Sequence, residues 1–184
     1  MLHPIALNQS KLPGKLSLPL SASLTEKGFQ EIISKGVRAG YPTVDLRAVL
    51  YDGSYHSVDS SEMAFKLAAH LAFKNGIPQA APVLLEPFYN IQVFVPEQYT
   101  GDVMGDLTSK RCKVEGIEQV KGRAVITAVG PLSELQRYAT DLRSMTQGRG
   151  YYTMTYSHYE EVPSHTAEQV IAKHKKEVGK EEEE

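Results

Sequence analysis

Apolar residues recur at helical spacing in the first part of the chain. Ser23 and Glu26 have the spacing of a capping box, which predicts a helix start. The apolar positions that follow at intervals of three and four are Phe29, Ile32, Ile33 and Val37. Gly40 and the Tyr41-Pro42 pair then predict the end of this helix.

A different pattern begins at Thr43. Apolar and polar residues alternate up to Tyr51, which predicts a half-buried strand with Val44, Leu46, Ala48 and Leu50 on one face. After a polar loop, Asp59 and Glu62 again have capping-box spacing. They predict a second helix that ends at Gly76 and Pro78. Its expected apolar stripe comprises Ala64, Leu67, Ala68, Leu71 and Ala72.

The second half of the chain follows a Pro-punctuated segment, residues 77–87, that predicts a junction between domains. The pattern beyond it predicts, in order, a strand over 88–95, a helix over 96–111, strands over 112–119 and 123–130, a helix over 131–148 and a strand over 151–156. This β-α-β-β-α-β order is that of a ferredoxin-like domain. The charged tail after Pro163 is expected to be a solvated helix.

Composition narrows the class of protein. The chain has 184 residues, 41% of them hydrophobic and 23% charged, with a formal net charge of −2, which is ordinary for a soluble globular protein. The single cysteine, Cys112, excludes an internal disulfide and a Cys-based zinc site. No apolar run approaches the ~18–20 residues of a membrane span, and no signal peptide is recognisable. We therefore expect a cytoplasmic protein without membrane partners.

The segment "YDGSYHSVDSSE", residues 51–62, contains the letters of a Ser-His-Asp triad. Triad members normally come from separated segments, however, and no G-x-S-x-G nucleophile elbow is present. A helix start also accounts for Asp59 and Ser60 without catalysis. A metal site from His56, Asp59 and Glu62 is equally weak, because only the histidine is a strong transition-metal ligand. We assign no catalytic residue and no metal ligand.

Signals for nucleotide binding are missing as well. The sequence contains no G-x-x-x-x-G-K-[ST] phosphate loop and no G-x-G-x-x-G after a strand. The glycine-rich "TQGRG", residues 146–150, could cradle a phosphate, but its place after a helix favours a C-cap.

The second half is locally basic. Between Lys110 and Arg149 there are eight Lys/Arg and four Asp/Glu, a local charge of +4 in a chain of −2. This is compatible with contact to a phosphate backbone, and also with an ordinary mixed-charge surface. The loop of residues 51–62 is not basic, so any contact it makes with RNA would use shape, hydrogen bonds and stacking by Tyr55.

Several stretches, taken in order, resemble the C-terminal part of translation elongation factor G, its domains IV and V. They are "GYPTVDLRAVLYDGSYHSVDSSEMAFKLAA", "PVLLEP", "GDVMGDLTSKR", "YATDLRSMTQGRG" and "HYEEVP". The resemblance implies an α+β chain of two domains. It divides into a divergent segment 1–22, an incomplete domain IV over 23–80, a ferredoxin-like domain V over 81–160 and a charged tail over 161–184.

The resemblance also implies where each domain makes contact. Domain IV would be an elongated βαβ structure with a left-handed crossover, whose tip reaches the decoding centre. The tip residues would be Asp52, Gly53, Ser54, Tyr55 and His56. Domain V would contact ribosomal RNA, with candidate residues Lys110, Arg111, Lys113, Arg143, Gln147 and Arg149.

The implied function is promotion of tRNA–mRNA translocation on the ribosome. The expected partners are rRNA and ribosomal proteins, the tRNA–mRNA complex and the remaining domains of a parent factor. The GTPase domain of the family is missing from this sequence, so we expect no enzyme activity and no cofactor here; GTP and Mg²⁺ would belong to the parent factor. The alternative is a stand-alone ribosome-binding regulatory module without GTPase activity.

Overall fold

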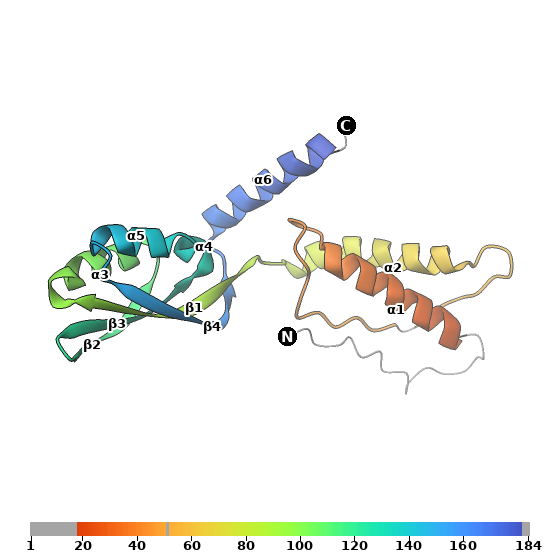
Figure 1. Ribbon diagram of the computed structural model, residues 1–184. Helices are drawn as coiled ribbons and strands as arrows, with labels where there is room; N and C mark the ends of the chain where they lie inside the picture. The colour runs from red at the N-terminus through yellow and green to blue at the C-terminus, as the bar shows by residue number, and fades with distance from the viewer. Residues whose placement is uncertain (1–17, 51, 182–184) are drawn as a thin grey trace. The chain divides into compact units, whose positions relative to one another are not determined.

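The computed structural model describes residues 18–50 and 52–181, and the chain divides into two compact units (Figure 1). The first unit comprises Met1–Pro82 and Ser164–Glu184, and the second comprises Val83–Pro163. The described residues combine a four-stranded sheet with helices, which confirms the expected α+β class. Most of the predicted segment 1–22, and Tyr51 before the predicted tip, lie outside the described residues.

The second unit is a sheet covered by helices on one face. Its strands are β1 (Leu85–Pro96), β2 (Lys113–Val120), β3 (Arg123–Pro131) and β4 (Tyr151–Glu161). They pair antiparallel in the order β2-β3-β1-β4. The helices α3 (Thr100–Ser109), α4 (Leu132–Leu135) and α5 (Tyr138–Met145) lie on the same side of it (Figure 1). This confirms the predicted ferredoxin-like order.

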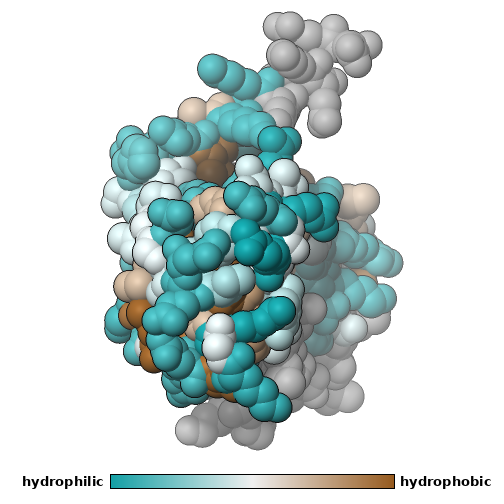
Figure 2. Space-filling model, turned by 60° about the vertical axis from the view of Figure 1, so that its left-hand side comes forward, coloured by the Kyte–Doolittle hydropathy of each residue, from teal (hydrophilic) through white to brown (hydrophobic). Residues whose placement is uncertain are grey.

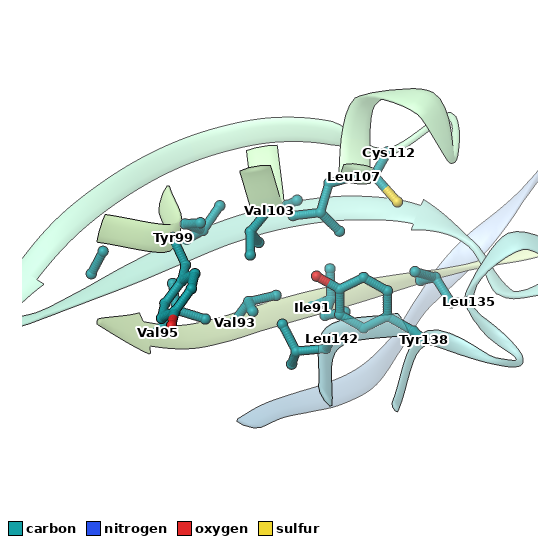
Figure 3. Close-up of a cluster of buried hydrophobic side chains, with 13 residues drawn as sticks. Ile91, Val93, Val95, Tyr99, Val103, Leu107, Cys112, Leu135, Tyr138 and Leu142 are labelled. Atoms are coloured by element: carbon teal, nitrogen blue, oxygen red, sulfur yellow. The ribbon is translucent and has the colours of Figure 1, made fainter. Parts of the chain in front are cut away.

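The core of the second unit lies between that sheet and its helices (Figure 3). Ile91, Val93 and Val95 of β1 are fully buried, as the alternation along this strand predicts. They pack with apolar side chains of β3, α3 and the α4–α5 region, among them Ile126, Val103, Leu107, Leu135, Tyr138 and Leu142.

Element boundaries in the second unit differ from the prediction in three places. A 3₁₀ turn, Glu97–Tyr99, precedes α3, and the predicted helix 131–148 is interrupted between α4 and α5. Strand β4 continues five residues beyond the predicted end at Tyr156. It does so because β1 offers pairing partners as far as Leu85, across an irregularity near Phe88 and Tyr89.

The first unit contains helices α1 (Leu18–Lys35), α2 (Glu62–Gly76) and α6 (Ser164–Glu181), and a 3₁₀ turn over Ile77–Ala80. Helices α1 and α2 pack closely at Gly28, where an added Cβ would lie 2.8 Å from the Lys66 Cα atom. Their shared core consists of Ile32, Phe73 and Ile77, with Phe29, Ile33, Val37 and Leu46 against it. The predicted apolar positions of the first helix are therefore confirmed.

The predicted start of α1 was wrong. The helix includes Leu18, so Ser23 lies inside it and is not a cap. Pro19 falls in the first described turn, where its missing N–H breaks no intrahelical hydrogen bond. The end of α1 lies at Gly36, with φ of 62°, rather than at Gly40. The Gly36 N–H donates to the Ile32 carbonyl at 3.0 Å.

The predicted strand over 43–51 is not formed in its described part, residues 43–50. The described residues of the first unit include no strand, so the expected βαβ crossover has no counterpart there. A strand needs a neighbour for its ladder hydrogen bonds, and Asp45, with φ of 54°, also leaves the extended region. The alternation still shapes burial, because Leu46, Ala48 and Leu50 are half-buried between exposed residues.

The predicted apolar stripe of α2 was also wrong. All five of its residues are exposed, with Leu67 and Leu71 more than half accessible. The buried residues of α2 are Ala69 and Phe73. Helix α2 is apolar on two sides, and in the described part of the chain α1 covers the side of Ala69 and Phe73 because Gly28 permits close approach.

Candidate functional site

The predicted tip is a polar loop that leads into α2. Residues 52–59 are all exposed, and the Tyr55 side chain retains 59% of its accessible surface. The carboxylate of Asp52 accepts a hydrogen bond from the Gly53 N–H at 2.8 Å, which fixes the start of the described loop. Exposure of this whole run makes its side chains available to a large partner.

A short turn closes the second half of the loop. The N–H of His56 donates to Ser60 Oγ at 2.8 Å, and the N–H of Ser60 donates to the His56 carbonyl at 3.0 Å. The His56 Nδ1 atom lies 3.2 Å from Asp59 Oδ2. Both Asp59 and Ser60 therefore make their contacts back into the loop, toward His56.

The predicted Asp59–Glu62 cap was wrong. The N-cap of α2 is Ser61, whose side chain accepts from the Ala64 N–H at 3.1 Å, and Glu62 is the first helical residue. The Ser61 hydroxyl therefore satisfies one of the free N–H groups at the helix start. This releases Asp59 from a structural role at the helix and leaves it with His56.

The loop geometry gives no support to a hydrolase or a metal centre. The Ser60 hydroxyl accepts the backbone N–H of His56, whereas a nucleophile would need its hydroxyl hydrogen-bonded to the imidazole. Among residues 18–50 and 52–181, no three His, Cys, Asp or Glu side chains are placed to hold a metal ion.

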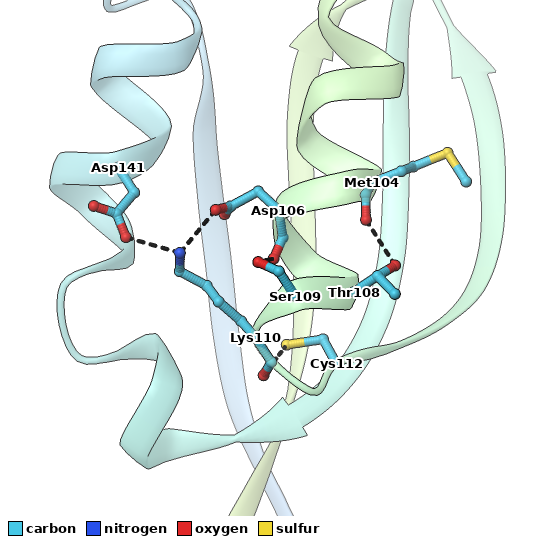
Figure 4. A network of polar contacts seen from close by, with 7 residues as sticks. All are labelled: Met104, Asp106, Thr108, Ser109, Lys110, Cys112 and Asp141. Carbon is cyan, nitrogen blue, oxygen red and sulfur yellow. Dashed lines mark hydrogen bonds and ion pairs between the residues drawn. The ribbon is translucent and has the colours of Figure 1, made fainter.

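Two of the six predicted RNA-contact residues have their charge paired within the second unit. Lys110 Nζ lies 2.8 Å from Asp106 and 3.1 Å from Asp141 (Figure 4). The hydrogen bond to Asp106 is the main reason that the pKa of Lys110 is raised. Arg111 pairs with the buried carboxylate of Glu86. These two cations stabilise the fold around the end of α3 and have less charge to offer a phosphate.

The other four candidates are exposed. Lys113 begins β2, Arg143 lies on α5, and Gln147 and Arg149 belong to the loop after α5. Figure 2, which brings the left-hand side of Figure 1 forward, shows a mostly hydrophilic surface with apolar side chains only in small groups. A surface of this kind suits polar and ionic contacts.

The loop after α5 is a well-defined cap, as predicted. The buried Thr146 hydroxyl donates to the Leu142 carbonyl at 2.7 Å and accepts from the Gly150 N–H at 2.9 Å. Gln147 and Gly148 both have positive φ, and the Gly148 N–H donates to the Arg143 carbonyl at 2.9 Å. The backbone that carries Gln147 and Arg149 is thus fixed at both ends.

The Arg149 side chain is held as well. Its guanidinium lies 5.2 Å from the centre of the Tyr99 ring, donates to the Tyr99 hydroxyl and donates to Gln147 Oε1 at 3.0 Å. Arg149 remains exposed. A pre-oriented, exposed cation loses less conformational freedom when it binds a phosphate.

The sequence alone did not indicate one further basic feature. Arg123 lies 5.8 Å from the centre of the Tyr151 ring, and that ring stacks on Phe94 at 4.6 Å. The alternation of β1 and β4 could have placed Phe94 and Tyr151 on the sheet face opposite the core, but their adjacency depends on strand order and register.

Comparisons with known proteins agree with this two-unit arrangement. The family model "Elongation factor G, domain IV" matches residues 21–81, and "Elongation factor G C-terminus" matches residues 83–170. The chain belongs to the elongation factor G family. The two matches, in this order, correspond to the C-terminal portion of elongation factor G and include no GTP-binding domain.

A solved structure supports the same assignment. A protein of Thermus thermophilus matches 90% of this elongation factor G chain with 40% sequence identity and a TM-score of 0.78. The chain spans 25% of that protein's length. Of the helices in the described residues, none has the length and apolar content needed to cross a membrane.

Proposed function

We propose that this chain is the ribosome-engaging C-terminal part of an elongation factor G, which promotes tRNA–mRNA translocation while a separate G domain hydrolyses GTP. The observation that carries the proposal is the exposed loop of Asp52–His56, whose second half is closed by hydrogen bonds. A loop of this kind can occupy space and make polar contacts with RNA without changing a covalent bond.

The second unit supports the proposal through its fixed basic loop. Arg149 is exposed and oriented by Tyr99, and Gln147 beside it adds a polar contact group. A positioned arginine suits the planar geometry of a phosphate. The expected partner of this loop is ribosomal RNA, and the expected place of action is the cytoplasm.

His56→Ala tests the proposal in a full-length elongation factor G that carries this chain as its C-terminal part. Loss of one polar contact that is made during translocation should slow that step about five- to tenfold. The rate of ribosome-stimulated GTP hydrolysis should be unchanged, because the substitution lies outside the G domain. Both rates can be measured by rapid mixing on the same ribosome complexes.

His158→Ala is the matched control. His158 is an exposed histidine of the second unit whose ring contacts Glu160 at 2.7 Å and stacks on Phe88. Its replacement should change neither rate. If His56→Ala slowed GTP hydrolysis as much as translocation, the assignment of the tip would be wrong.

A further inference from the structure

Ser60 fixes the backbone of His56. The two residues exchange two hydrogen bonds, His56 N–H to Ser60 Oγ and Ser60 N–H to the His56 carbonyl, at 2.8 and 3.0 Å. Ser60 is followed by Ser61, the N-cap of α2. The histidine backbone is therefore connected through Ser60 to the first turn of a 15-residue helix, which restrains an otherwise exposed loop.

The imidazole of His56 has two alternative partners at one nitrogen. Nδ1 lies 3.2 Å from Asp59 Oδ2 and 3.4 Å from the Val58 nitrogen. A protonated Nδ1 can donate to the carboxylate, whereas an unprotonated Nδ1 can accept from the Val58 N–H, so the two contacts exclude each other. The contact with the carboxylate is the shorter and is charge-assisted, which favours the proton on Nδ1.

This choice decides what the other ring nitrogen can do. In the described part of the chain, no hydrogen-bond partner contacts Nε2. In a neutral ring with the proton on Nδ1, Nε2 is a hydrogen-bond acceptor. It would then suit a donor on the partner, and the ribose 2′-hydroxyl of RNA is such a donor.

We propose that Asp59 and Ser60 are positioning residues for His56. Ser60 fixes its backbone on α2, and Asp59 holds the proton on Nδ1 so that Nε2 accepts a hydrogen bond from the ribosomal partner. The positioning itself rests on the loop geometry alone; only its use on the ribosome depends on the proposed function.

Hydrogen exchange in the 184-residue chain tests the part played by Ser60. Ser60→Ala removes the acceptor of the His56 N–H, and the exchange rate of that amide should rise about fivefold, as loss of one modest hydrogen bond implies. Ser57→Ala, in the same exposed loop, is the matched control and should leave the rate unchanged. An unchanged rate in Ser60→Ala, or an equal rise in both variants, would overturn the role of Ser60.

Nitrogen resonances of the imidazole test the part played by Asp59 at a pH where the ring is neutral. Asp59→Ala removes the acceptor, so the Nδ1 resonance should move to the position of an unprotonated nitrogen and Nε2 should gain the proton. Asp59→Asn keeps an oxygen acceptor and should retain most of the Nδ1–H form. If the resonances of Asp59→Ala matched those of the unsubstituted chain, Asp59 would have no such role.

The same substitutions, placed in the full-length factor, separate this inference from the proposed function. We expect Ser60→Ala and Asp59→Ala to slow translocation toward the rate of His56→Ala, and Asp59→Asn to recover most of it. Changed resonances with unchanged translocation would leave the positioning established and contradict the ribosomal role. Unchanged resonances would contradict the positioning whatever the translocation rate.

Discussion

Cys112 occupies a confined place at the start of β2. Its side chain is buried, and its Sγ lies only 2.3 Å from the point where a Cβ on Gly130 would stand. Arg111, with φ of 59°, makes the left-handed turn out of α3, so Cys112 itself needs no glycine-like backbone. Burial, together with the carboxylates of Asp106 and Glu134, raises the pKa of the thiol from 9.0 to about 11.

This raised pKa predicts a loss of stability in alkali. The folded chain keeps the thiol proton between pH 9 and pH 11, where the unfolded chain releases it, so the free energy of unfolding falls as pH rises through this window. From about pH 8 to about pH 10 the contribution of Cys112 should fall by about 1.3 kcal/mol. Urea unfolding, monitored by circular dichroism at both pH values, measures the change.

Cys112→Ala provides the comparison. The variant should lose less stability than the unsubstituted chain over the same pH interval, because Lys110 and Tyr138, whose pKa values are also raised, contribute equally in both proteins. Identical losses in the two proteins would show that the buried thiol does not titrate as described.

Residue-level contacts in the tip show the limit of sequence reasoning. Asp59, Ser60 and Ser61 can each cap a helix, and the spacing of Asp59 and Glu62 favours the first of them. Which one caps α2 depends on where the loop turns, and here that turn is closed by the pairing of Ser60 with His56. Composition and spacing cannot distinguish among neighbouring residues with the same hydrogen-bonding groups.

At the scale of elements, the contact between α1 and α2 depends on Gly28. An alanine Cβ there would lie 2.8 Å from Lys66 Cα and 3.0 Å from Ala69 Cβ, so the helices would have to separate. Crowding of this kind costs about 1–3 kcal/mol, more than the gain in helix propensity. Gly28→Ala should therefore accelerate hydrogen exchange of the amides of α2.

Gly105 offers a matched control in α3. No atom lies within 4 Å of its hypothetical Cβ. Gly105→Ala should stabilise the second unit by about 0.5–1 kcal/mol and slow exchange in α3. If Gly28→Ala left α2 as protected as Gly105→Ala leaves α3, the close packing of α1 on α2 would be wrong.

Elements of the second unit could be predicted well because their patterns are self-sufficient. Ile91, Val93 and Val95 alternate with polar residues, and every strand finds its partner within Val83–Pro163. In the first unit the same alternation over 43–50 lacks a neighbouring strand, and α2 has two apolar sides. Period alone cannot show which side of such a helix will be covered.

At the scale of the whole molecule, two compact units place polar contact groups on separate loops. The first unit presents His56 on a closed turn, and the second presents Arg149 on a capped one. Both groups are exposed and restrained by contacts within their own unit. This suits a chain that binds a large RNA-containing partner at more than one place.

Competition for ribosomes tests this account most directly. The 184-residue chain should displace labelled full-length elongation factor G from ribosomes, and its apparent affinity should fall steeply as salt rises, because its contacts are to phosphates. Displacement at micromolar chain and low salt is the result that the account predicts. No displacement at high micromolar chain and low salt would contradict the claim that these two units engage the ribosome.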